Sequence, residues 1–304
     1  MKKFLATLCT AVLAVTACFG AVACGGSDGA KSGKVKLVNV PLSSESYGIA
    51  VNKQDASLLT SINELLSEKS AEIAAMINEY ESKDYEDDTP TDNSYVDGVV
   101  TYAESMSGND QYLVMATDAP FAPWEYKVGE NWGGIDVEIG KMIADKLDKT
   151  LAVKQTAFDT ICMTVEQGGA DIGLAGLTIT PAREKSVTFS TPYYNEAYQV
   201  VVVAEEDTRF DACTTTADVE AVLAAAKNGT KVGSQTGTTG AKFISGDLND
   251  PDGFGFTGYS NLTLKPYDTH ADAVRDMVNG QVSFCIVDNL VAAQIVAQIN
   301  AAIK

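Results

Sequence analysis

The sequence predicts an α/β protein built from two lobes. From Tyr112 onward, apolar strand-like runs alternate with runs of helical period, and the alternation begins a second time at residue 198. A chain of 304 residues is long enough for two hydrophobic cores, and its hydrophobic content of 45% is ordinary for a globular protein. We therefore expect two sheets, mainly parallel, each covered by helices.

The N-terminus predicts export. MKKFLATLCTAVLAVTACFGAVACGGS has two lysines, an apolar stretch and small residues before a cysteine. The pattern resembles a bacterial lipoprotein signal, which implies a signal peptide at 1–23, lipidation of Cys24 and a tether at 24–33. Cys18 is a second match to the same pattern, and a plain cleaved signal is a third interpretation.

Charge and cysteine content exclude several functions. The formal net charge of −19 disfavours a nucleic-acid partner, and the single histidine, His270, leaves little for a metal centre or a catalytic triad. We expect no metal and no cofactor.

Three cysteines lie beyond the signal: Cys162, Cys213 and Cys285. This odd number disfavours a disulfide framework. Cys162 and Cys285 lie in apolar runs and predict buried side chains, and a Cys213–Cys285 bridge is the less favoured alternative.

The first elements precede a linker. KVKLVNV at 34–40 and YGIAV at 47–51 predict short strands, and a helix is expected over 57–80. Residues 84–110 are acidic and rich in turn formers, with one short apolar patch at Val99-Val100, and they predict a linker. Two short strands cannot form a sheet alone, so their partners must lie downstream.

The alternating elements follow in two rounds. The first round comprises a strand at 112–118, a helix at 135–147, a strand at 151–157, a helix from 159 and a strand at 170–176. The second comprises a strand at 198–206, a helix at 217–227, a strand at 230–237, helices from 238 and 269, a strand at 282–288 and a C-terminal helix.

Candidate ligand residues follow the predicted strands. GLTITPAREKSVTFSTPYY, residues 176–194, offers Gly176 for close backbone approach, threonine hydroxyls including that of Thr178, and Arg183. The planar guanidinium suits a carboxylate, so the loop predicts an anion site. The alternative is that Arg183 pairs with a surface acid.

The other lobe supplies matching groups. In GSQTGTTGAKFI, Thr238 and Thr239 can cap a helix whose free amides face an anion, although a bare turn is the alternative. The strand SFCIVDN ends in Asp288, which could hold an ammonium group.

ATDAPFAPWEY places Asp118, Phe121 and Trp124 after the strand from Tyr112, with a core position favoured for Trp124. Phe158 offers a second aromatic side chain beside Phe121. The cation of Arg183, the anion of Asp288 and the threonine hydroxyls together suit the two opposite charges of an α-amino acid.

The motifs YLVMATDAPFAPWEY, GGIDVEIGKMIADKL, FDTI, ADIGLAGLTITPAREKSVTFSTPYY, VGSQTGTTG and IVDN occur in this order. In combination they resemble the polar amino-acid-binding lipoproteins of ABC importers, the type II periplasmic binding protein family. The resemblance implies a two-lobed clamshell, lipid-anchored on the outer face of the cell membrane as a monomer, with a free amino acid and an ABC permease as partners.

The resemblance also implies residue roles. Arg183 with Thr178 and Thr238 or Thr239 would clamp the α-carboxylate, while Asp288 and the backbone near Gly176 would hold the α-ammonium. Phe121 and Phe158 would sandwich the ligand side chain. Asp118 would face that side chain and favour a polar or cationic ligand.

The chain order departs from the family. A segment like residues 34–80 comes last in the resembled proteins and first here, which implies a circular permutation. Lobe 1 would then span 44–192 with the linker 84–110 inserted, and lobe 2 would comprise 34–40 plus 197–304. Hinges are expected near 40–43 and 193–197.

The resulting hypothesis is a binding protein without catalysis that delivers an amino acid to a permease. An enzyme similar to the cyclohexadienyl dehydratases, with Asp118 or Glu125 as its acid, is one alternative. A ligand-sensing lipoprotein is the other.

Overall fold

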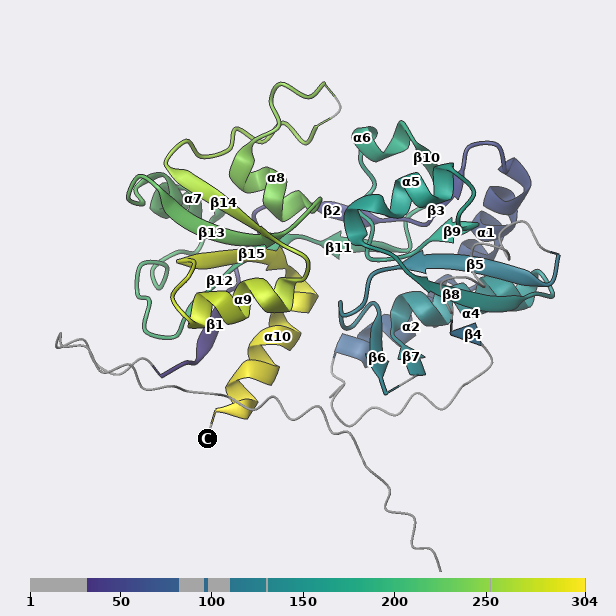
Figure 1. Cartoon of the computed structure of the whole chain (residues 1–304), viewed down its shortest axis with the longest axis horizontal. Coiled ribbons are helices and arrows are strands. Elements are labelled where there is room, and N and C mark those ends of the chain that lie inside the picture. Colours follow the sequence, from purple (N-terminus) through teal and green to yellow (C-terminus); the bar gives the residue numbers. More distant parts are fainter. Residues whose placement is uncertain (1–31, 82–95, 98–109, 130, 252, 304) are drawn as a thin grey trace, which may run out of the picture. The chain divides into compact units, whose positions relative to one another are not determined.

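The computed structural model describes residues 32–81, 96–97, 110–129, 131–251 and 253–303, with side chains omitted at 96–97. The expected signal peptide, Cys24, the Val99-Val100 patch and most of the linker lie outside the described residues. Two large sheets with their helices form most of the described chain, and they are named lobe 1 and lobe 2 here (Figure 1).

Lobe 1 contains a six-stranded sheet of order β10-β3-β9-β5-β8-β4. Its strands are β3 (Ala50–Asn52), β4 (Val96–Asp97), β5 (Tyr112–Thr117), β8 (Thr150–Gln155), β9 (Ile172–Gly173) and β10 (Val187–Phe189). A hairpin of β6 (Tyr126–Val128) and β7 (Asn131–Gly133) lies beside it. The helices are α1 (Ala56–Glu68), α2 (Ser70–Glu81), α4 (Ile135–Lys146), η1 (Phe158–Thr160), α5 (Ile161–Glu166) and α6 (Pro181–Glu184).

Lobe 2 contains a five-stranded sheet of order β1-β12-β15-β13-β14. Its strands are β1 (Val35–Val38), β12 (Gln199–Ala204), β13 (Thr230–Gln235), β14 (Leu262–Tyr267) and β15 (Phe284–Asp288). The helices are α7 (Thr216–Ala224), α8 (Thr239–Ser245), α9 (His270–Val278) and α10 (Asn289–Ala302).

Both sheets are mixed, so the expectation of mainly parallel sheets is correct only for part of each. β9, β5, β8 and β4 run parallel, as do β15, β13 and β14. β3 is antiparallel to β9, and β12 is antiparallel to β15. The reason is the route of the chain, since β3 and β12 each follow an extended crossing from the other lobe rather than a helix.

The two crossings pair with each other. β2 (Glu45–Tyr47) and β11 (Tyr194–Ala197) form a two-stranded antiparallel sheet between the lobes (Figure 1). β2 leads into β3, where Ala50 pairs with both Gly173 and Phe189. The run YGIAV thus finds its sheet partners far downstream, as expected.

The helix expected over 57–80 is two helices. α1 ends at Glu68 and α2 begins at Ser70, with a non-helical backbone at Lys69 (φ −104°, ψ 8°). The residues buried by the two helices are Ile62, Leu65, Leu66, Ile73, Ile77 and Tyr80, which confirms one core-facing stripe. The apolar spacing continues across the break, so the sequence pattern could not locate it.

Two further expectations need correction or completion. Residues 96–97, within the segment expected to be a linker, form the short strand β4 beside β8. Cys162, Cys213 and Cys285 are all free, which excludes a Cys213–Cys285 bridge here. Cys285 is buried as expected, whereas Cys162 is only partly buried.

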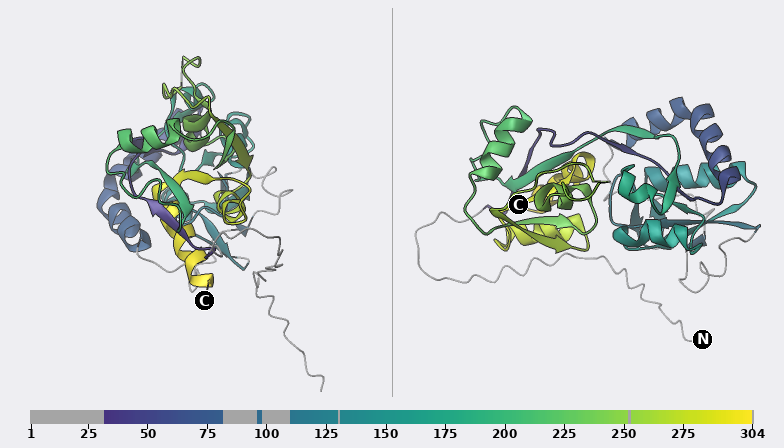
Figure 2. Two further views of the ribbon diagram at one scale, coloured as in Figure 1. Left: turned by 90° about the vertical axis from the view of Figure 1, so that its left-hand side faces the viewer. Right: turned by 90° about the horizontal axis from the view of Figure 1, so that it is seen from above.

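The first strand and the last helix of the described chain are neighbours (Figure 2). The Asn300 side chain of α10 accepts from the Val35 N–H at 2.9 Å and donates to the Val35 carbonyl at 2.8 Å. In the described part of the chain, no helix combines the length and apolar content that a membrane crossing requires.

Candidate functional site

Arg183 stands where loops of the two lobes meet. Thr180 caps the short helix α6 by accepting from the Arg183 N–H at 3.1 Å, which fixes the start of the side chain. The guanidinium donates to the Thr178 carbonyl at 2.7 Å and, across the lobes, to the Gly237 carbonyl at 3.2 Å. Its centre lies 5.0 Å from the centre of the Phe158 ring, a cation–π contact. Burial lowers the pKa of Arg183 from its ordinary value.

Gly176 lies in a tightly packed loop. Its φ is +54°, and a Cβ added there would lie 2.7 Å from Cε1 of Phe121. Its N–H donates to the buried Asp136 at 2.8 Å. Burial raises the pKa of Asp136 to about 7, although the bond from Gly176 opposes the shift. The backbone at Gly176, part of the predicted ammonium site, is therefore fixed by its hydrogen bond to the buried carboxyl group of Asp136.

The three threonine hydroxyls bond to the protein itself. Thr178 and Thr239 each donate to Oε2 of Glu45, at 2.7 and 2.8 Å. Thr238 accepts from the Ala241 N–H at 3.2 Å, which caps α8, and donates to the Gln235 carbonyl at 2.8 Å. Because a hydroxyl has one proton, none of the three can donate to a carboxylate ligand in this arrangement.

Asp288 ends β15 and is 5% exposed. It accepts from the Tyr47 hydroxyl at 2.6 Å and from the Gln199 amide at 2.9 Å. Burial, and then the charge of Glu45, raise the pKa of Asp288 to about 7.

His270 lies at the start of α9, with Nε2 3.6 Å from Oδ2 of Asp288. Burial lowers the pKa of His270 to about 3, so the ring is neutral and the contact is not an ion pair. Neither ring nitrogen has a hydrogen-bond partner among the described residues.

Asp118 follows β5 and bridges the lobes. It accepts from the Phe158 N–H at 3.0 Å and from the amides of Gln155 and Gln235, both at 2.9 Å. Gln235 belongs to lobe 2. Burial raises the pKa of Asp118 to about 6, against the opposing effect of these bonds.

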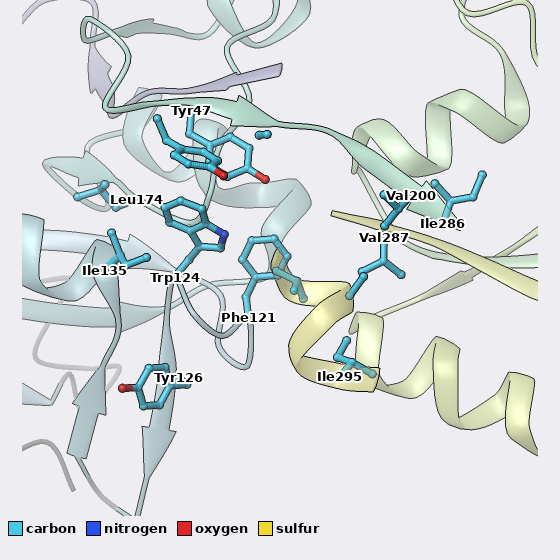
Figure 3. Close-up of a cluster of buried hydrophobic side chains, with 14 of the residues drawn as sticks. Tyr47, Phe121, Trp124, Tyr126, Ile135, Leu174, Val200, Ile286, Val287 and Ile295 are labelled. Carbon is cyan, nitrogen blue, oxygen red and sulfur yellow. The ribbon is translucent and has the colours of Figure 1, made fainter. Parts of the chain in front are cut away.

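The aromatic residues divide between site and core. Phe121 stacks on His270 of lobe 2, with ring centres 5.6 Å apart. Trp124 is 1% exposed and packs on Tyr47 and Tyr194 at 5.0 and 4.9 Å, which confirms its core position. Figure 3 shows Tyr47, Trp124 and Phe121 together in this cluster.

The predicted groups therefore come together from both lobes, along with five that the sequence did not single out for binding: Glu45, Tyr47, Gln199, Gln235 and His270. Gln199 opens the apolar strand β12, a position that a search for polar residues at strand ends could have found, whereas Gln235 ends the largely polar strand β13 and gave no such signal. Within the described ranges, no group of three or more metal-ligating side chains is present. A guanidinium and several carboxyl groups in one place suit an organic ligand that carries both a positive and a negative charge.

Comparison with known proteins gives the same fold. Residues 113–303 match the bacterial extracellular solute-binding proteins, family 3. The chain is 29% identical over 180 residues to the putative ABC transporter arginine-binding protein 2 of Escherichia coli (strain K12), covering 59% of this chain and 64% of that protein. It is 37% identical over 97 residues to the arginine-binding extracellular protein ArtP of Bacillus subtilis (strain 168), covering 32% and 38%.

Among solved structures, an ancestral arginine-binding protein bound to arginine superposes with a TM-score of 0.52 at 30% identity. The match covers 63% of this chain and 76% of that one. The chain spans less than two thirds of the length of the curated relatives named above. Because the family match extends over most of the chain, this protein belongs to the bacterial extracellular solute-binding proteins, family 3, with a type II periplasmic-binding-protein fold.

Proposed function

We propose that the protein captures a free amino acid with a cationic side chain between its lobes and delivers it to an ABC permease. The observation that carries this proposal is the meeting of opposite charges from the two lobes: Arg183 of lobe 1 donates to the Gly237 carbonyl of lobe 2, and Asp288 of lobe 2 accepts from the Tyr47 hydroxyl. Burial lowers the pKa of Arg183, and the charges of Cys162, Glu45 and Asp288 oppose that effect, which supports a guanidinium and a carboxyl group that act on the same ligand. A free amino acid carries the two opposite charges that such a pair binds.

The charge balance favours a cationic ligand. Glu45 and Asp288 are buried carboxyl groups whose charges act on the Arg183 guanidinium, and Asp118 is a third buried carboxyl group, which bonds across the lobes to Gln235. An α-carboxylate on Arg183 and an α-ammonium on Asp288 leave Asp118 for the end of the ligand side chain. A cation there offsets its charge, and the arginine-binding relatives agree with this class of ligand.

The proposal includes no chemistry on the ligand. Of the two acids considered for a dehydratase, Glu125 is fully buried, and Asp118 already accepts three hydrogen bonds. Purified protein should therefore leave prephenate and arogenate unchanged. Turnover of either compound would replace binding with catalysis as the function.

We also infer that the chain is exported by residues 1–23 and anchored through Cys24, which supports a place beside the permease. Labelled palmitate should enter the wild-type chain in cells, and Cys24→Ala should abolish incorporation. If Cys18→Ala abolished palmitate incorporation instead, Cys18 would be the lipidated residue.

A thermal-shift screen of the twenty amino acids tests the binding function. A ligand at a hundredfold excess over its dissociation constant stabilises by about 2.7 kcal/mol, and we expect arginine or lysine to give the largest shift. Arg183→Ala should remove the shift for every amino acid, because all share the α-carboxylate. Asp118→Asn should retain binding and reorder the preference among side chains.

The matched control is Arg275→Ala, which removes an exposed arginine of lobe 2 that pairs only locally with Asp272. It should retain the wild-type shifts. Shifts that persist in Arg183→Ala, or a screen in which no amino acid stabilises the wild type, would count against the proposal.

A further inference from the structure

Two buried carboxyl groups lie close together in lobe 1, beside the loop that carries Gly176. Glu125 and Asp136 are both 0% exposed, and the charge of Asp136 acts on Glu125. The Asp136 N–H donates to the Trp124 carbonyl at 2.8 Å, which holds the start of α4 against the residue before Glu125. A Cβ added at Gly134 would lie 2.9 Å from Cα of Glu125, so only glycine permits this approach. The two side chains therefore share one enclosed part of the core.

Most oxygen atoms of this pair have no protein partner. Within the described part of the chain, neither oxygen of Glu125 and only one oxygen of Asp136 takes part in a hydrogen bond. The buried Thr117 and Tyr193 hydroxyls and the buried Trp124 indole N–H also lack a bond of ordinary geometry. Because buried polar atoms are almost always paired, so many unpaired atoms in one place need a physical cause.

The main charges that act on the pair are negative. Besides burial, the effects on the pKa of Asp136 come from the Gly176 N–H and from the hydroxyl of Tyr193, which is uncharged because burial raises its own pKa well above the ordinary value. The charges that act most on Glu125 are those of Asp136 and Asp118. Two ionised carboxylates here would repel each other strongly, and a bridging water molecule would not remove that repulsion. One bound proton would remove it.

The bond from Gly176 decides where the proton lies. Oδ2 of Asp136 accepts from the Gly176 N–H at 2.8 Å, which favours the charged form of Asp136. Burial raises the pKa of Glu125 well above its ordinary value, whereas that of Asp136 is about 7. Above neutral pH the proton therefore belongs to Glu125, whose O–H can donate to the unpaired Oδ1 of Asp136.

One peptide group links the pair to the candidate site. The Ala175 carbonyl and the Gly176 N–H belong to the same trans peptide, so they point in opposite directions. The bond from this N–H to Asp136 therefore turns the Ala175 carbonyl away from the pair. The same loop touches residues of the site, since a Cβ added at Gly176 would lie 2.7 Å from Phe121 and 3.3 Å from Tyr47.

We propose that Glu125 and Asp136 form an acid pair that holds one proton in the core and keeps the peptide between Ala175 and Gly176 in its ligand-binding orientation. Glu125 bears the proton, and Asp136 is the charged acceptor. Both are positioning residues that touch no ligand. The proton is a property of lobe 1 alone, and only the effect on affinity rests on the proposed capture of an amino acid.

Infrared spectroscopy of the purified protein at pH 8 tests the proton without a ligand. A protonated carboxylic acid has a C=O stretch that is separate from those of carboxylates and amides. The pKa values of Asp118 and Asp288, about 6 and about 7, leave these groups mostly ionised at this pH. The wild type should therefore show one such band, and Glu125→Gln should abolish it. Asp136→Asn should keep the band at a shifted frequency, because Glu125 then loses its charged partner.

Asp247→Asn is the matched control. It removes a buried carboxyl group of lobe 2, which accepts from the Phe254 and Phe256 N–H groups at 2.6 Å each, and it should leave the band unchanged. A wild type without the band, or a band that persists in Glu125→Gln, would overturn the proposal.

Calorimetry with L-arginine tests the link to the ligand site. Glu125→Gln keeps a donor for Asp136 and should bind as tightly as the wild type. Glu125→Leu fills a similar volume without a donor, so it should weaken binding about tenfold, the effect of one lost hydrogen bond to a charged group. Equal affinities of the two variants would show that residue 125 only fills the core.

Thermal unfolding of both variants checks that they fold. If Glu125→Leu does not fold, the infrared bands of the wild type and of Glu125→Gln still decide the proposal. If no amino acid binds the wild type, the proposed function fails, while the same bands still show whether the pair holds a proton.

Discussion

The side chain of Asp288 is partly protonated, and a bound α-ammonium group would shift it to the charged form. Its carboxyl group is buried next to Glu45, and its pKa of about 7 means that it is about half protonated at neutral pH. An α-ammonium binds the charged form. The groups that contact it are Tyr47, Gln199 and the neutral His270, while Glu45 and the Arg183 guanidinium interact with it through their charges. Binding of an amino acid should therefore release a proton from this group.

The predicted consequence is an affinity that rises with pH. Below about 7 the protonated fraction of Asp288 competes with the ligand, so the affinity should rise by up to tenfold per pH unit and level off above this value. Calorimetry in two buffers of different ionisation enthalpy measures the released proton directly. Equal apparent enthalpies at pH 6.5 would contradict the assignment of the ammonium to Asp288.

The same pKa shifts set the stability of the empty protein. The folded pKa values of Asp118, Asp136 and Asp288 all lie above the ordinary value for aspartate, so the folded state binds protons that the unfolded state has lost. Their contribution is most favourable below pH 4 and declines as the pH rises through 6 and 7. The difference in thermal midpoint between ligand-bound and empty protein should thus widen over this range.

The positions of candidate residues were predictable where strand ends decide them. Asp118 follows β5 and Asp288 ends β15, and such strand ends carry the loops that meet ligands in α/β proteins, whereas Arg183 lies on α6 in the segment after β9. Glu45 was missed because its burial depends on the pairing of β2 with β11 and on the loop at Thr178. Neither partner is near it in the sequence.

At the scale of elements, the loop after β9 depends on one glycine. Gly176→Ala should lower the free energy of unfolding by about 2 to 4 kcal/mol, because it combines a left-handed backbone with a clash against Phe121. Phe121 cannot move aside without losing its stack on His270, so ligand affinity should fall as well.

Gly168→Ala is the matched control for this loop. Gly168 has φ +73°, and nothing lies within 4 Å of an added Cβ, so only the backbone cost of about 1 to 2 kcal/mol applies. Chemical denaturation of both variants isolates the clash. Equal losses would show that Phe121 does not constrain Gly176.

Buried strands were predictable and edge elements were not. β5, β12 and β15 are continuous apolar runs, as expected of strands covered on both faces. β14 lies at the edge of its sheet and contains Lys265 and Pro266, so it lacks that pattern. β10 has only three residues, which is too short for any period to show.

At the scale of the whole molecule, the proposed permutation can be reversed. Asn300 bonds both backbone groups of Val35, and a Cβ added at Gly33 would lie 3.3 Å from Ile303. A chain that runs from 96 to 303 and continues directly into 33–81 keeps every described strand and should therefore need no change in either lobe. Its thermal midpoint should lie within about 5 °C of the wild type, with the same ligand preferences.

A chain reopened within β13, between Val232 and Gly233, is the control, because it cuts a buried strand that pairs on both sides. It should not fold. If the rejoined chain also failed to fold, the proximity of β1 and α10 would not reflect an older continuous order.

The pairing of Val35 with Ala204 carries a consequence for biogenesis. β1 is synthesised before every other element described, yet its only described strand neighbour, β12, is made after lobe 1 is complete. During export, lobe 1 can fold while β1 is still unpaired, and an unpaired strand is an open edge that can pair with a strand of another chain. Chaperone dependence of secretion should therefore be governed by how quickly lobe 2 closes that edge, and hardly at all by the folding of lobe 1.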